Sequence, residues 1–136
     1  MKLELLDINE RGDKDFDALR EVEKDLYVLL LFYHLHEMEG ITHFFSHHLD
    51  HLPRVLTFLA AIEAPNWPAV SDLAQLFKAK AGGTWEPHAL EKFFRNMSNE
   101  DIDKINAWTS EYYSKTQEMW ERAREYVKQE HDVEFD

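Results

Sequence analysis

Histidine is the residue type whose spacing suggests chemistry in this chain, because six of the eight histidines fall within residues 33–63. His43, His47 and His51 are four residues apart, so an unbroken helix would present all three on one face. Histidines at this spacing are a common way for a helix to hold zinc. One hypothesis is therefore a metal- or small-ligand-binding site, in which His43 and His47 are joined by His36 or His51.

The same stretch also contains residues that would interrupt such a helix. Gly40 stands where a helix can end in a left-handed turn, and Pro53 disfavours a helix that runs through residues 49–52. A break there removes His51 from the row and leaves two ligands on one face, whereas transition-metal sites need three or four. We therefore predict no metal and no cofactor, and we interpret the histidines as lining a helix end and the polar side of a packing surface.

A catalytic nucleophile paired with a base is not recognisable in the sequence. There is no cysteine, no Gly-x-Ser-x-Gly turn and no glycine-rich phosphate loop after a strand. No motif groups an acid, a base and an electrophile, which are the parts that an active site requires. We therefore expect no catalytic residues and no enzymatic activity.

Charge gives the clearest indication about partners. The chain has 27 acidic and 15 basic residues, a formal net charge of -12 at pH 7. This excess repels nucleic-acid phosphates and anionic lipid surfaces, so direct binding to nucleic acid or membrane is disfavoured. A basic protein is the favoured partner. The alternative interpretation is that the charge only keeps the protein soluble.

Carboxylates on the expected first and last helices are the candidate contacts for such a partner. Acids three or four residues apart on a helix lie about 5 to 6 Å from each other, which resembles the phosphate repeat of a DNA strand. The candidates are Asp15, Asp17, Glu21, Asp25, Glu118, Glu121 and Glu125. Basic residues between them dilute these rows, and this favours an ordinary solvated face. They are Lys14, Arg20, Lys24, Arg122 and Arg124.

Helices must position these side chains. Apolar residues three and four apart, the spacing that predicts a helix, recur over most of the chain. We predict an all-α, single-domain bundle of about six helices, with residues 1–12 as a short helix or N-terminal arm that could dock on the core and residues 130–136 as an acidic tail that frays. The expected helices are residues 13–39, from 41 to the break before Pro53, from Pro53 to about 62, 68–81, from a cap at Thr84 onward, and 100–129, with a bend near residues 114–116.

Localisation and oligomeric state are less strongly indicated by the sequence. The N-terminus lacks a secretory leader, no apolar run is long enough to span a bilayer, and the absence of cysteine is compatible with a reducing compartment, so we expect a cytoplasmic protein. The aromatic residues after residue 84 are interpreted as core residues because their helical spacing explains them. A homodimer seam near the C-terminus is the alternative.

The residues around Gly40 also resemble a known family. Residues 37–46, Glu-Met-Glu-Gly-Ile-Thr-His-Phe-Phe-Ser, are similar to the signature of a bacterial DNA-mimic protein family. Phe44 and Phe45 match its aromatic pair, residues 59–64 match a step of small residues that ends a helix, and residues 111–127 are similar to its closing helix. This chain has one glycine in the turn where the family usually has two.

The resemblance implies an all-helical fold that can dimerise and an acidic surface that binds a DNA-binding transcription regulator in place of DNA. Small size and acidity are also typical of immunity or toxin-neutralising proteins, which stay open as a third hypothesis beside the mimic and the metal- or small-ligand-binding protein. The favoured hypothesis is a non-enzymatic acidic protein that binds a basic partner.

Overall fold

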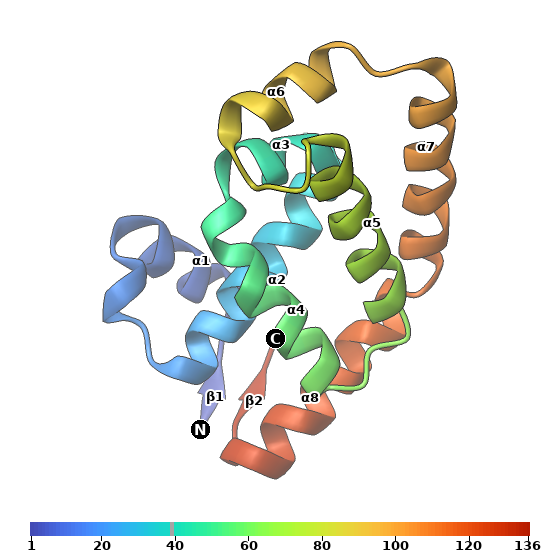
Figure 1. Ribbon diagram of the computed structural model, residues 1–136. Helices are drawn as coiled ribbons and strands as arrows, with labels where there is room; N and C mark the ends of the chain where they lie inside the picture. Colours follow the sequence, from blue (N-terminus) through green and yellow to red (C-terminus); the bar gives the residue numbers. More distant parts are fainter. Residues whose placement is uncertain (39) are drawn as a thin grey trace.

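The computed structural model (Figure 1) describes residues 1–38 and 40–136, with the side chains of all of these except 35–38. Its eight α-helices within this part of the chain are α1 (Leu5–Lys14), α2 (Glu21–Met38), α3 (Ile41–His47), α4 (Leu52–Ala61), α5 (Trp67–Lys80), α6 (Pro87–Arg95), α7 (Asn99–Ser114) and α8 (Thr116–His131). Two 3-10 turns, η1 (Phe16–Ala18) and η2 (Leu49–His51), and two short strands, β1 (Lys2–Leu3) and β2 (Glu134–Phe135), complete the order. The predicted all-α class is confirmed, but about six helices was too few.

Helix α2 passes through the middle of the molecule, as Figure 1 shows, with α1 on one side and α5 and α7 on the other. α6 lies near α3 at one end, and α8 lies at the opposite end. α2 packs against α1, α3 and α4, and the side chains of Leu26, Val28, Leu29 and Phe32 are fully buried. A helix that is apolar around most of its circumference is typical of a central position in the core.

Aromatic rings join the central helices to the outer ones. Phe32 of α2 contacts Phe44 of α3 at 4.9 Å and Tyr112 of α7 at 5.5 Å between ring centres. Phe45 contacts Phe77 of α5 at 4.7 Å. All five rings are at most 1% exposed, and edge-to-face pairs of this kind stabilise a core beyond the area they bury. The aromatic pair at 44 and 45 is therefore a packing feature of the fold.

The first long helix begins later than predicted. Residues 13–39 were expected to form one helix, but α1 ends at Lys14, η1 follows, and α2 begins at Glu21; residue 39 lies outside the described residues. α1 turns back onto α2 because Gly12 allows close packing. A Cβ atom at Gly12 would lie 2.3 Å from Cδ2 of Tyr27. The apolar residues within 16–22, whose spacing suggested one helix, thus belong partly to the turn η1 and partly to α2.

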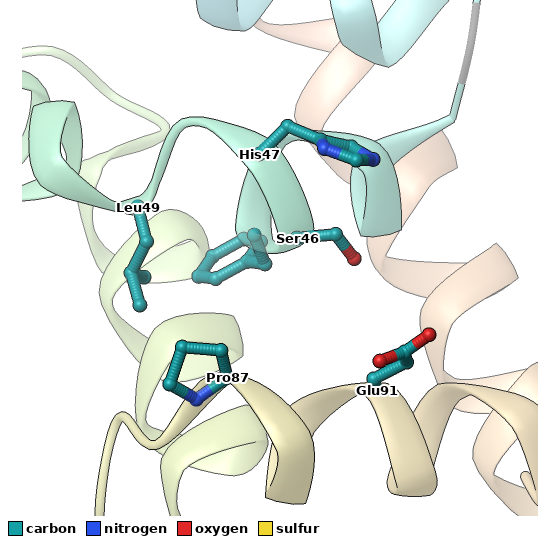
Figure 2. A pocket seen from close by; sticks show the side chains of 6 residues that line it. Ser46, His47, Leu49, Pro87 and Glu91 are labelled. Atoms are coloured by element: carbon teal, nitrogen blue, oxygen red, sulfur yellow. The ribbon is translucent and has the colours of Figure 1, made fainter.

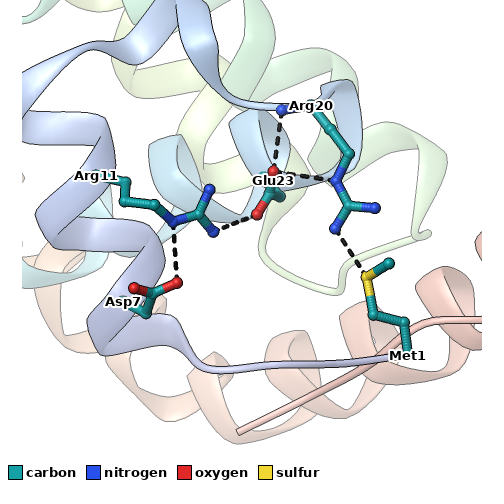
Figure 3. A network of polar contacts seen from close by, with 5 residues as sticks. All are labelled: Met1, Asp7, Arg11, Arg20 and Glu23. Carbon is teal, nitrogen blue, oxygen red and sulfur yellow. Dashed lines mark hydrogen bonds and ion pairs between the residues drawn. The ribbon is translucent and has the colours of Figure 1, made fainter.

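A buried carboxylate fixes the point at which α2 begins. The side chain of Glu23 is 4% exposed and accepts hydrogen bonds from the backbone N–H of Arg20 at 3.0 Å and from its Nε at 3.2 Å. Arg11 of α1 also donates to Glu23, and Figure 3 shows the two arginines on either side of the carboxylate. An acid at the third helical position that binds the N-cap amide is half of a capping box. The network therefore ties α1, the turn and α2 together.

The two ends of the chain pair with each other, so the expected fraying of residues 130–136 was wrong. Residues 1–12, expected as a short helix or arm, hold β1 and most of α1. β1 and β2 form a two-stranded parallel sheet, in which Leu3 aligns with Phe135. Asp132 adopts a left-handed conformation that ends α8, and Val133 and Phe135 are then 5% and 3% exposed. Acidic residues at 134 and 136 alternate with these two apolar side chains, which is the period of a strand. The apolar positions anchor a segment that its charge alone suggested was free.

Several predicted helix ends are confirmed. Gly40 lies in the left-handed region (φ 84°) before α3, and α4 begins directly before Pro53. The hydroxyl of Ser98 accepts a hydrogen bond from the amide three residues later at 3.1 Å and caps α7. The cap of α6 differs from the prediction. Glu86, and not Thr84, accepts from two backbone amides of its first turn.

Candidate partner-binding surface

Three of the predicted acids share one side of α8. Glu118, Glu121 and Glu125 are all exposed. Steps of three and four residues keep them on one side of the helix and place them about 4.5 and 6 Å apart along its axis. The opposite side of α8 holds the fully buried Met119, Ala123 and Val127, so packing fixes which way the acids face.

The basic residues of α8 have partners elsewhere in the protein. Within the described residues, the three acids form no ion pair, although Glu121 accepts a hydrogen bond from Gln117 at 3.4 Å. The pairs are Arg122 with Glu63 (3.8 Å), Arg124 with the ring of Phe135 (5.3 Å to the ring centre) and Lys128 with Asp132 (3.1 Å). The cations that appeared to dilute the acidic row are therefore directed toward other groups.

Two shallow depressions run along the junction of α4 and α8. One of about 370 Å³ is lined by both helices and includes Asp25 and Tyr126; the other, of about 270 Å³, includes Glu63, Glu125 and Glu130. Sequence reasoning missed Glu63 and Glu130. Glu63 has a positive φ of 55° at the end of α4, which places it beside α8, and no local pattern indicates that approach. Glu130 follows Glu125 by five residues, outside the spacing used to choose candidates.

The candidates near the N-terminus fall into two kinds. Asp15 and Asp17 are exposed around η1. Glu21 is exposed as well, but it and the partly buried Asp25 both bind Arg54 of α4, at 3.0 and 2.9 Å. Burial raises the pKa of Asp25 although Arg54 acts in the opposite direction, whereas Arg54 lowers the pKa of Glu21. These two acids serve mainly to join α2 to α4.

The histidines do not form the row of three that an unbroken helix would give. The rings of His43 and His47 on α3 lie 4.3 Å apart between centres. His51 belongs to η2, where its ring packs against Phe16 at 4.7 Å, because the chain leaves the helix before Pro53. The side chain of His36 lies outside the described residues. Among the side chains that are described, no group of three or more His, Cys, Asp or Glu could hold a metal ion.

A small cavity of about 260 Å³ separates α3 from α6. Figure 2 shows Ser46 and His47 on one side of it and Pro87 and Glu91 on the other. The hydroxyl of Ser46 donates to the carbonyl of Thr42 at 2.9 Å, and Glu91 pairs with Arg95 at 2.5 Å. Both groups are thus engaged within their own helices.

None of the helices in the described part of the chain is long and apolar enough to cross a membrane.

Comparison with known proteins identifies the family. The family model described as DMP19-like protein matches residues 17–130, which is most of the chain. Neither the curated proteins nor the solved structures gave a match. The DMP19 family is a family of DNA mimics, which are generally non-enzymatic, and this confirms the resemblance seen around Gly40. The chain belongs to the DMP19-like protein family.

Proposed function

We propose that this protein binds a basic DNA-binding protein, such as a transcription regulator, and excludes DNA from it. Carboxylates of α8 make the principal contacts, with Asp15 and Asp17 as additional acids around η1. The protein acts by binding and has no catalytic step. The exposed row of Glu118, Glu121 and Glu125 is the observation that carries this proposal.

The row is suited to this role for an electrostatic reason. Its acids are held on a helix whose opposite side is buried, so little backbone freedom is lost when a partner binds. The basic residues of α8 are engaged with other groups, and the net charge of -12 attracts a basic partner over a distance. Salt should weaken the complex, because exposed charges are screened.

The test uses a triple variant, Glu118→Gln, Glu121→Gln and Glu125→Gln, which removes three charges and keeps side-chain size. A matched control, Glu10→Gln, Asp72→Asn and Asp103→Asn, removes three charges from exposed acids on α1, α5 and α7. DNA-binding proteins captured at low salt are identified, and displacement of a labelled duplex from each is measured by fluorescence anisotropy.

We expect the wild-type protein and the control to displace DNA equally well. Three exposed ion pairs contribute about 1 to 3 kcal/mol together, so the α8 variant should need roughly 5- to 150-fold more protein. If no captured DNA-binding protein releases its DNA, the mimic function is wrong. If the two triple variants lose the same amount, the function survives but the assignment to α8 does not.

A further inference from the structure

We propose that His43 and His47 form a binding site for a divalent transition-metal ion on the surface of α3. This site is independent of the acids of α8. The two imidazoles are one helical turn apart, and their ring centres are separated by 4.3 Å with an angle of 40° between the rings. The protein supplies two ligands, one or two fewer than a site built wholly from protein ligands, and water completes the coordination shell.

The separation of the rings fits a single ion. Metal–nitrogen bonds are about 2.0 to 2.1 Å long. If the two metal–nitrogen bonds meet at about 90°, the centres of the two imidazole rings lie roughly 4.5 Å apart. The observed 4.3 Å is close to this value, so the two rings are near enough to share one ion once a nitrogen of each turns toward it. Each ring needs only one nitrogen for the metal, so a hydrogen bond through the other nitrogen is compatible with the site.

The surroundings allow an ion to enter and remain hydrated. His47 is exposed and His43 is half-buried. His47 is one of the residues that line the cavity between α3 and α6, and Figure 2 shows its ring pointing away from Pro87 and Glu91. Two imidazoles without a thiolate favour Cu²⁺, Ni²⁺ and Zn²⁺ over Mg²⁺ and Ca²⁺, with Cu²⁺ bound most tightly.

An ion at this position would act on the fold through α3. The helix has seven residues, fewer than an isolated helix needs to be stable in water. It carries Phe44 and Phe45, two of the fully buried core rings. Linking residues 43 and 47 favours the helical conformation, so bound metal should stabilise the packing of both rings.

The experiment is titration of untagged, metal-free protein with Cu²⁺ by calorimetry, with electron paramagnetic resonance as the second measurement. We expect one tight ion per chain and a spectrum with coupling to two imidazole nitrogens. His47→Gln and His43→Gln should each weaken binding by at least about tenfold, the loss that even outer-shell substitutions produce at metal sites. His88→Gln, which removes an exposed histidine from α6, should change neither measurement.

Thermal unfolding with Ni²⁺ distinguishes this site from non-specific binding. The ion should raise the midpoint of the wild type and of His88→Gln, and it should leave His47→Gln unchanged, because the chelate exists only when α3 is folded. Cu²⁺ binding of equal strength in the wild type and His47→Gln, or an equal Ni²⁺ shift in both, overturns the proposal. Neither result bears on whether the acids of α8 displace DNA.

Discussion

Replacing Glu23 with glutamine removes the negative charge at which α1, the turn after it and α2 meet. The carboxylate is 4% exposed and is bound by Arg20 through backbone and side chain, and by Arg11 (Figure 3). Glutamine keeps the size and one carbonyl oxygen of the side chain. It loses the charge and places an amide that cannot accept beside two guanidinium groups. The substitution therefore tests the ion pairs rather than the packing.

The size of the effect follows from the pKa of Glu23. Burial alone would raise this pKa, but hydrogen bonds from Arg11 and Arg20 outweigh it and lower the value from 4.5 to about 2. Such a shift corresponds to at most about 3 kcal/mol of stability at neutral pH. The arginines are 43% and 50% exposed, so solvent screens the pairs and we expect a loss of about 1 to 3 kcal/mol.

The lowered pKa also determines how the stabilisation by Glu23 changes with pH. Because the pKa is lowered by folding, the stabilisation is fully present above pH 4.5 and is lost as the pH falls toward 2. At pH 3.5 up to about 1.4 kcal/mol, and roughly 0.4 of the whole contribution, should already be lost, since the unfolded chain binds the proton more readily. The difference in stability between wild type and Glu23→Gln should therefore become smaller in acid.

Urea unfolding followed by tryptophan fluorescence measures both quantities, at pH 7, 5, 4 and 3.5. Glu10→Gln, which neutralises an exposed acid of α1, controls for the change in net charge and should differ little from wild type at every pH. A destabilisation below about 0.5 kcal/mol, the range of ordinary surface substitutions, would refute the reasoning. A larger difference that stays constant from pH 7 to 3.5 would refute the assignment to the carboxylate charge.

Three further substitutions should be informative, each measured by urea unfolding. Gly12→Ala should destabilise by about 1 to 3 kcal/mol, because its Cβ would overlap the ring of Tyr27; equal stability would contradict the close packing. Phe135→Ala should cost about 3 kcal/mol and speed hydrogen exchange at the amide of Leu5, which donates to residue 136; unchanged exchange would contradict docking of the tail. Ser98→Ala should cost about 1 kcal/mol, whereas Ser98→Thr should retain most of the cap.

Local signals predicted the fold class and most helix ends. Gly40 and Pro53 determine backbone conformation by themselves, and Ser98 caps a helix through a bond three residues away. Long-range contacts decided what was predicted wrongly. The division between α1 and α2 depends on the packing of Gly12 against Tyr27, residues fifteen positions apart, and periodicity does not detect it.

The candidate partner-binding surface shows the same contrast between local signals and long-range contacts. Spacing alone selected Glu118, Glu121 and Glu125, and the structure places all three on the exposed side of α8. Spacing could not indicate that Arg54 forms ion pairs with Glu21 and Asp25, because Arg54 lies on another helix. The partner of Arg122, Glu63, likewise comes from a distant part of the chain. Ion pairs between elements thus distinguish acids that join helices, including the exposed Glu21, from the three acids of α8, which form no ion pair among the described residues.

The parallel pairing of β1 with β2 has a consequence for synthesis. Leu3 leaves the ribosome well before its partner Phe135, which is 132 positions later. The apolar side chain of Leu3 therefore has no strand beside it while all eight described helices are being made. Closing so long a loop is entropically unfavourable, so β1 should join the fold last. During translation the protein carries an unpaired strand edge that a chaperone could recognise.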